Sequence, residues 1–296
     1  MSAVEPETLA ARATVAAALA RGAEALAAAG IASARVDAEW LLAGALDVPR
    51  GRLMADPARA LDGEAAARYA RAITRRMTRE PLQHIIGTQA FRDLAVRVGP
   101  EAMVPRPETE ALVEWALALL PDVPAPVVVD VGTGTGCIAC AIAAERPAAR
   151  VIALELSTAA AGLARANVGA LGLEARVTVV ESDLFAALGS LRADLIVANP
   201  PYLPTAIIAT LDPEVSRFDP RLALDGGDDG LDVIRRLVVA APARLAPGGA
   251  LVMETAGGEQ ATATARLLSA AGFADVQTRA DLAGVERFVA GVERAA

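Results

Sequence analysis

Apolar residues recur at helical spacing through the first 80 residues of the chain. An alanine-rich segment with regularly placed leucines extends to Gly30, a residue type that commonly ends helices. Ser33 is placed to cap a second helix and Asp62 to cap a third. Helices joined by such short connections pack as a bundle, so we predict a small helical bundle over residues 7–80.

The spacing changes to a period close to two between Gly87 and Gly99. Alternation over a short stretch with glycine at both ends is typical of a β-hairpin, and we predict a hairpin linker over residues 83–105. The run Arg-Pro-Glu-Thr-Glu at 106–110 then predicts the start of a helix. Pro107 would lie in its first turn, with carboxylates near the positive end of the helix dipole.

From residue 127 onward, short β-branched runs alternate with helical segments. The predicted strands cover residues 127–131, 151–156, 177–180, 195–198, 250–253, 273–278 and 285–289, and two of the helices cover 137–145 and 157–171. Such alternation predicts an α/β fold with a mostly parallel sheet covered on both faces, and the last two strands predict an antiparallel pair at its edge. Three parts follow: a helical domain (1–82), the hairpin linker (83–105) and an α/β domain (106–296).

Composition narrows the chemistry that the chain can perform. All 28 basic residues are arginine, and His84 is the one histidine, which excludes Schiff-base chemistry, a P-loop lysine and a multi-histidine metal site. We therefore predict no metal. The net charge of −8 lies wholly in residues 111–296, because residues 1–110 hold 14 arginines and 14 acidic residues. Proteins that bind nucleic acid need a basic surface, so this acidic charge argues against a general nucleic-acid-binding function.

The residues at the start of the sequence predict no signal peptide, and no segment predicts a membrane span. Glu5 and Glu7 stand where a signal peptide carries basic residues, and arginines interrupt the alanine-rich stretch that follows. Cys137 and Cys140 have the C-x-x-C spacing of redox and zinc sites, but no second pair completes a metal site. We expect a cytoplasmic protein with two reduced cysteines in its core.

A glycine-rich turn follows the first predicted strand, with Asp130 before it. The turn consists of Gly132, Thr133, Gly134, Thr135 and Gly136. Glycines there allow a ligand to approach the backbone above a helix N-terminus. A dinucleotide fingerprint needs its third glycine at position 137, which is cysteine. The turn with a preceding acid instead suits S-adenosylmethionine, because the cationic amino-acid end of that molecule favours a carboxylate over a phosphate cradle.

Three further residues follow or end predicted strands and complete the predicted cofactor site. Glu155 ends the second strand, where a carboxylate can accept two hydrogen bonds from ribose hydroxyls. An ordinary solvated acid is the alternative, but the position at the sheet edge favours a ligand. Asp183, after the third strand, is placed to accept from the adenine amino group, and Leu184 to form an apolar wall.

The most specific motif is Asn199-Pro200-Pro201-Tyr202, directly after the fourth predicted strand. A simple turn is the alternative interpretation, yet open α/β sheets bind ligands at this edge. The chemistry fits a planar NH₂ group, which is a poor nucleophile because its lone pair is delocalised. The Asn199 side-chain oxygen and the Pro200 carbonyl can each accept one N–H. Tyr202 can pack on the planar group, and Pro201 stiffens the turn.

Together these motifs resemble the class I S-adenosylmethionine-dependent methyltransferases that modify planar amino groups. Further stretches narrow the resemblance: residues 80–87, 104–110, 182–185 and 219–227. With them, nearly the whole chain from about residue 33 resembles the peptide chain release factor glutamine methyltransferases, the PrmC or HemK family. The resemblance implies a Rossmann-like, mostly parallel seven-stranded sheet with a small N-terminal helical bundle that recognises the protein substrate.

The resemblance also implies a reaction. The Asn-Pro-Pro-Tyr motif would hold the glutamine of the Gly-Gly-Gln loop of release factors, while the glycine turn, Glu155, Leu184 and Asn199 would contact the cofactor. In-line attack of the glutamine nitrogen on the sulfonium methyl would give N5-methylglutamine and S-adenosylhomocysteine without a strong base. The chain departs from the family in three places. Glu155 stands where aspartate is commoner, and Leu184 replaces a frequent aromatic. Residues 254–260 lack the usual Glu-Ile-Gly pattern, and we assign no role to this segment.

Three other functions share parts of the pattern. A sister family methylates a ribosomal-protein glutamine, but it usually differs in the Arg-Pro-Glu-Thr segment. A DNA adenine N6-methyltransferase uses the same chemistry and needs a base-flipping surface with a basic groove. A binding module without catalysis is the third. We predict a release factor as partner, no nucleic-acid or membrane partner, and a monomer.

Two features outside the motifs also carry hypotheses. Arg68, Arg71, Arg75 and Arg79 lie at helical spacing along the third predicted helix. A solvated face is the simpler interpretation, and a docking surface for acidic residues of the release factor is the alternative. Residues 203–226, a long segment with prolines and aspartates, predict a flexible cover over the glutamine.

Overall fold

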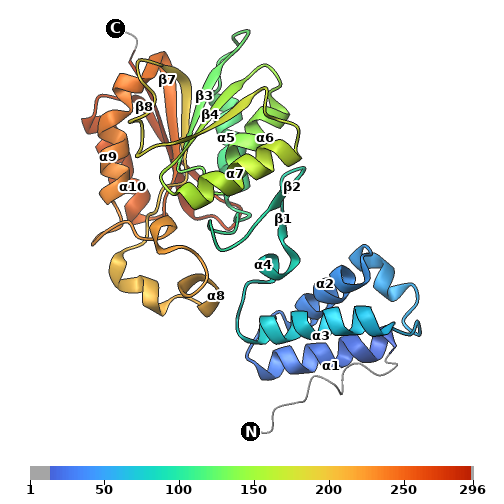
Figure 1. Ribbon diagram of the computed structural model, residues 1–296. Helices are drawn as coiled ribbons and strands as arrows, with labels where there is room; N and C mark the ends of the chain where they lie inside the picture. The colour runs from blue at the N-terminus through green and yellow to red at the C-terminus, as the bar shows by residue number, and fades with distance from the viewer. Residues whose placement is uncertain (1–13, 295–296) are drawn as a thin grey trace. The chain divides into compact units, whose positions relative to one another are not determined.

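The computed structural model describes residues 14–294, and contacts divide the chain into two compact units (Figure 1). The first unit holds the described residues up to Gly87 together with Pro213–Phe218. The second holds Thr88–Asp212 and the described residues from Asp219 onward. The order of motifs along the chain did not predict that an interior segment groups with the N-terminal helices.

The first unit is helical, as its apolar spacing predicts. Its elements are α1 (Val15–Ala28), α2 (Ala34–Leu46), the 3₁₀ helix η2 (Arg50–Met54), α3 (Gly63–Met77), α4 (Leu82–Ile86) and α8 (Pro213–Ser216). Asp62 caps α3 by accepting from the Ala65 amide at 2.7 Å, as predicted. Ser33 precedes α2, but its side chain makes no capping bond, which corrects that prediction. The predicted start of the first helix, at residues 7–13, lies outside the described residues.

The arginines on α3 make bonds within the helical unit. Arg68 donates to the Ala45 carbonyl at 2.7 Å, and Arg75 pairs with Glu80 at 2.5 Å. Arg79 lies beyond the end of α3 and pairs with Glu214 at 2.6 Å. Among the described residues, Arg71 is the one member of this stripe that is exposed and makes no bond within the unit, so the hypothesis of a docking surface for the release factor keeps this one unpaired arginine.

One buried arginine next to the stripe organises the charges of this unit. Arg76 is 5 % exposed and pairs with Asp37 at 2.7 Å and with Glu214 at 2.8 Å. Burial raises the pKa of Glu214, but hydrogen bonds from Arg79 and Arg76 outweigh burial and leave that pKa below its usual range. Paired in this way, the charges avoid the large cost of isolated burial.

The second unit begins with a hairpin, β1 (Thr88–Phe91) and β2 (Leu94–Arg97), paired antiparallel. It is shorter than predicted, because residues 82–86 form α4. Phe91 and Val96 are buried in the core of this unit, and Asn167 exchanges two hydrogen bonds with the backbone of Arg97 at 2.7 and 3.0 Å. The hairpin is therefore packed against the α/β unit.

Seven strands form the main sheet in the order β5-β4-β3-β6-β7-β9-β8. They are β3 (Val127–Val131), β4 (Arg150–Glu155), β5 (Val177–Glu181), β6 (Ala193–Ala198), β7 (Leu245–Glu254), β8 (Ala274–Ala280) and β9 (Glu286–Val292). β3 to β7 are parallel, and β8 with β9 is the antiparallel pair predicted at the edge. The class I methyltransferase type of fold is thus confirmed.

Helices cover both faces of this sheet. On one face lie α5 (Thr109–Leu119), α6 (Cys137–Glu145) and α7 (Thr158–Ala170), and on the other α9 (Asp232–Ala240) and α10 (Glu259–Ala270). Short 3₁₀ helices η3 (Thr205–Thr210), η4 (Arg221–Ala223) and η5 (Pro242–Arg244) interrupt the connections. α5 begins at Thr109 with Glu108 at its N-cap, so Pro107 precedes the first turn in which it was predicted. Among residues 14–294, no helix is long and apolar enough to cross a membrane.

Replacing Arg76 by methionine removes the positive charge between Asp37 and Glu214. Asp37 is 4 % exposed and would lose this ion-pair partner, so we expect the free energy of unfolding of the helical unit to fall by about 3 kcal/mol. Urea unfolding followed by Trp40 fluorescence in a Trp115→Phe background measures this, because the chain has 2 tryptophans. Arg71→Met, at an exposed position of the same helix, is the control, with a change of about 0.5 kcal/mol or less. Equal effects of the two substitutions would contradict the buried ion-pair account.

Candidate active site

A cavity in the second unit collects most of the residues predicted from the strand ends. Its lining includes Gly132, Thr133, Gly134 and Thr135 after β3, Glu155 at the end of β4, Asp183 and Leu184 after β5, and Asn199, Pro200 and Pro201 after β6. Gly136 and Tyr202 are not among the lining residues. Met103, Pro105, Leu222, Val233 and Arg236 also line the cavity and were not predicted.

The glycine turn leaves backbone exposed to the cavity. Gly132 and Gly136 have φ values of 73° and 81°, which favour glycine. A Cβ at Gly132 would meet no atom within 4 Å, whereas one at Gly136 would lie 3.3 Å from the Ala164 Cβ. Gly136 therefore serves close packing against α7, and Gly132 leaves open space at the cavity wall.

Asp130 supports this turn from within the protein. Its side chain is fully buried and accepts hydrogen bonds from the Thr133 hydroxyl and from the Ala139 amide at 3.2 Å. Burial raises the pKa of Asp130 to about 7, and the two hydrogen bonds oppose that rise. Asp130 is absent from the cavity lining, so its carboxylate holds the turn and the start of α6 together.

Glu155 also binds backbone amides of the site. One carboxylate oxygen accepts from the Gly134 amide at 2.8 Å, and the other accepts from the Ser157 amide at 2.9 Å. The side chain is 8 % exposed and lines the cavity, which distinguishes it from a solvated acid. Glu155 therefore links the glycine turn to the end of β4.

Asp183 and Leu184 form another part of the wall. The Asp183 carboxylate, which we predicted to accept from the adenine amino group, pairs with Arg236 of α9 at 2.7 Å. Leu184 has a φ of 46°, and its carbonyl accepts from the Ser182 hydroxyl at 2.8 Å. This bond holds the strained backbone that places an apolar side chain on the cavity.

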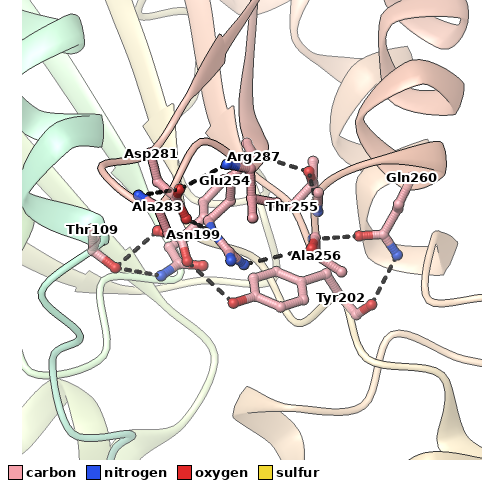
Figure 2. A network of polar contacts seen from close by, with 12 residues as sticks. Thr109, Asn199, Tyr202, Glu254, Thr255, Ala256, Gln260, Asp281, Ala283 and Arg287 are labelled. Atoms are coloured by element: carbon pink, nitrogen blue, oxygen red, sulfur yellow. Dashed lines mark hydrogen bonds and ion pairs between the residues drawn. The ribbon is translucent and has the colours of Figure 1, made fainter.

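Asn199 and Tyr202 are joined through a buried carboxylate that the sequence reasoning left without a role. Asn199 Nδ2 donates to the Thr109 hydroxyl oxygen at 3.2 Å, and the Thr109 hydroxyl donates to Glu254 at 2.8 Å. The Tyr202 hydroxyl donates to the other Glu254 oxygen at 3.1 Å (Figure 2). The Glu254 carboxylate thus joins the start of α5, the Asn-Pro-Pro-Tyr motif and the end of β7.

Burial raises the pKa of Glu254, and the bonds from Thr109 and Tyr202 and the charge of Arg287 oppose that rise. Burial, followed by the negative charge of Glu254, raises the pKa of Tyr202, so its hydroxyl stays protonated and remains a donor. Glu254 ends β7 at the same sheet edge as Glu155, a signal that could have identified it. Thr109 belongs to the Arg-Pro-Glu-Thr segment that carries the family resemblance.

The segment after the Asn-Pro-Pro-Tyr motif is structured by its own bonds. The Leu203 amide donates to the Leu224 carbonyl at 2.9 Å, and the Thr205 hydroxyl donates to Asp225 at 2.5 Å. Asp219 pairs with Arg106 at 2.7 Å, and its side chain is 1 % exposed. Burial raises the pKa of Asp219, with the Arg106 charge opposing the rise. These bonds tie the segment that contains Leu222 into the wall of the cavity. The predicted movement of this segment over the glutamine stays a prediction.

The two cysteines lie in the core on α6. Both are free thiols, and burial raises the pKa of each to about 12, which keeps them protonated at neutral pH. Among the described residues, no group of three or more His, Cys, Asp or Glu side chains could hold a metal ion.

The fold and this site define a methyltransferase. The chain resembles the crystal structure of the hMettl16 catalytic domain with a TM-score of 0.59 and 16 % identity, over 73 % of this chain and 81 % of that one. It resembles a methyltransferase from Pyrococcus furiosus with a TM-score of 0.51 and 17 % identity, over 69 % and 91 % of the two chains. At such low identity these likenesses show the fold alone. The family model of the methyltransferase small domain matches residues 111–209.

The sequence relatives specify the family. Residues 17–87 match the model of the PrmC N-terminal domain. The release factor glutamine methyltransferase of Geobacter sulfurreducens is 46 % identical over 88 % of this chain and 90 % of its own length. That of Cereibacter sphaeroides is 46 % identical over 89 % and 93 %. The chain belongs to the release factor glutamine methyltransferase family, which confirms the resemblance.

Proposed function

We propose that this enzyme transfers a methyl group from S-adenosylmethionine to the side-chain amide nitrogen of the glutamine in the Gly-Gly-Gln loop of peptide chain release factors. The observation that carries the proposal is the presence of Asn199 and Pro200 in the same cavity as the glycine turn. The names of the relatives, at 46 % identity over nearly the whole chain, support release factors as the substrate. We further propose that it acts in the cytoplasm as a monomer.

The cavity residues fit S-adenosylmethionine by their chemistry. Gly132 leaves open space where backbone can approach a ligand, and the Glu155 carboxylate can accept hydrogen bonds from ribose hydroxyls. Leu184 supplies an apolar wall, and Asp183 an acceptor for an amino group. When bound, S-adenosylmethionine supplies a methyl group activated by a positively charged sulfonium.

The protein's contribution is to orient a weak nucleophile. Asn199 Nδ2 is directed at Thr109, so Oδ1 is the amide atom that can accept an N–H of the glutamine. The Pro200 carbonyl can accept the second N–H. Two fixed acceptors hold the NH₂ plane and favour electron density on its nitrogen. The proton lost from the methylated amide can pass to water, so no side chain with base strength near neutral pH is needed.

Mass mapping of a release factor after incubation with labelled S-adenosylmethionine tests the substrate. We expect one methyl group on the Gly-Gly-Gln glutamine and none on a release factor in which that glutamine is replaced by alanine. Parallel reactions with ribosomal proteins and with duplex DNA test the other acceptors of the same chemistry. A methyl group on either of them, with an unmodified release factor, would overturn the proposal.

Replacing Asn199 by alanine removes one of the two acceptors. We expect kcat to fall by about 100-fold or more, because the glutamine nitrogen is no longer held in its reactive orientation. Calorimetric affinity for S-adenosylhomocysteine should stay within about threefold, since the glycine turn and Glu155 are unchanged. Full activity in this variant would be incompatible with the proposed role.

Replacing Glu155 by alanine should weaken S-adenosylmethionine binding by about tenfold or more. The variant loses the acceptor for ribose hydroxyls and the bonds to the Gly134 and Ser157 amides. Glu181→Ala is the matched control, because Glu181 is the register partner of Glu155 on β5 and does not line the cavity. Calorimetry should show an affinity within about twofold of the parent protein for the control. Equal affinities of the two variants would refute the ribose contact.

A further inference from the structure

We infer that Thr109 and Glu254 are positioning residues that set which way the Asn199 side-chain amide faces, an inference that rests on the proposed function. An asparagine amide has nearly the same shape when its oxygen and nitrogen are exchanged. Only one of the two orientations presents an acceptor to the glutamine. The surrounding hydrogen bonds must therefore choose between them.

The choice begins at Glu254. Its side chain is 1 % exposed, and its two oxygens face the hydroxyls of Thr109, at 2.8 Å, and Tyr202, at 3.1 Å. Both hydroxyls donate to these oxygens, the arrangement that a carboxylate with two accepting oxygens requires. The single hydroxyl hydrogen of Thr109 is thereby directed at Glu254.

The consequence reaches Asn199 through Thr109. With its hydrogen committed, the Thr109 oxygen can only accept on its other side, where Asn199 Nδ2 lies at 3.2 Å. A reversed amide would place Oδ1 against this oxygen with no hydrogen between them. That arrangement sets two acceptors against each other at a part-buried position and loses a hydrogen bond. The polarity of the chain from Asn199 through Thr109 to Glu254 is therefore fixed by the carboxylate.

The orientation matters for the reaction. With Nδ2 held by Thr109, Oδ1 lies on the other side of the amide, available to accept from the glutamine. In the reversed orientation an N–H of Asn199 would meet an N–H of the substrate. The substrate glutamine would then lose one of its two acceptors, even though Asn199 itself is still present.

Neighbouring contacts keep the carboxylate and the motif in place (Figure 2). Ala198 and Met253 are register partners on β6 and β7, so Asn199 and Glu254 follow paired positions. Gln260 of α10 donates to the Tyr202 carbonyl at 2.9 Å. Arg287 is held by Asp281 at 2.9 Å, and its charge favours the ionised form of Glu254. The network is anchored on both faces of the sheet.

Thr109→Val tests the inference because it keeps the shape of the side chain and removes the hydroxyl. We expect kcat with the release factor to fall by about tenfold or more, while the KM for release factor and the affinity for S-adenosylhomocysteine stay within about threefold. Thr109→Ser restores the hydroxyl and should recover most of the lost kcat. Thr264→Val is the matched control, because Thr264 is 0 % exposed and its hydroxyl has no partner among the described residues.

Glu254→Gln tests the source of the polarity. A glutamine side chain has one accepting oxygen and one donating NH₂ group, so it cannot accept from both the Thr109 and the Tyr202 hydroxyls as the two Glu254 oxygens do. We therefore expect kcat to fall in this variant too. In the double variant Thr109→Val/Glu254→Gln, kcat should fall little further than in the more affected single variant, because both changes act through Asn199. Independent, additive losses would overturn the inference. So would a Thr109→Val enzyme as active as the Thr264→Val control.

A readout without turnover separates this inference from the proposed function. In ¹⁵N-labelled protein, the Asn199 side-chain amide signal can be assigned by its loss in Asn199→Asp. We expect this signal to shift in Thr109→Val, to return in Thr109→Ser and to stay unchanged in Thr264→Val. An unshifted signal in Thr109→Val overturns the orienting role. If the parent enzyme transfers no methyl group to release factor, the proposed function fails while the amide signal still decides the inference.

Discussion

The parallel register of β3, β6 and β7 is the constraint on which the site depends. Val131 pairs with Ala198, and Ala198 pairs with Met253, so the next residue of each strand lies at one sheet edge. Those next residues are Gly132, Asn199 and Glu254. Neighbouring strands lie about 4.8 Å apart, which brings the glycine turn, Asn199 and the buried carboxylate within reach of one another. The backbone ladder, more rigid than any loop, sets the spacing of these groups.

Three buried charged groups of this protein are held in bonded networks, because burying an unpaired charge is costly. Glu254 has a hydroxyl on each oxygen, and Glu155 has a backbone amide on each. In the helical unit, Arg76 lies between two carboxylates. Such networks restrict each side chain to one orientation. A chemistry that depends on two acceptors in fixed positions gains from that restriction, and it suits a chain with no lysine and one histidine.

The segment after the Asn-Pro-Pro-Tyr motif shows how one stretch of chain can belong to two units. Residues 213–218 group with the helices, where Glu214 accepts from Arg76 and Arg79. Directly afterwards, Asp219 is buried against Arg106, and Leu222 lines the cavity. Asp219 and Arg106, which pair at 2.7 Å, belong to two motifs that lie 113 residues apart in the sequence.

The sequence by itself determined the order of strands and helices, the glycine turn and the Asn-Pro-Pro-Tyr motif, because periodicity and turn chemistry are local. It also placed Glu155 and Asn199 at one edge, since the carboxyl ends of parallel strands meet there. Only the tertiary structure decided the roles of Thr109 and Glu254. Their partners lie 90 and 145 residues away, and such pairings depend on strand register and helix packing. Arg76 lies at helical spacing from the buried Tyr69 and Ile73, so its place on the buried face could be read from the sequence. Its partners Asp37 and Glu214 come from other elements, so only the tertiary structure decided how its charge is paired.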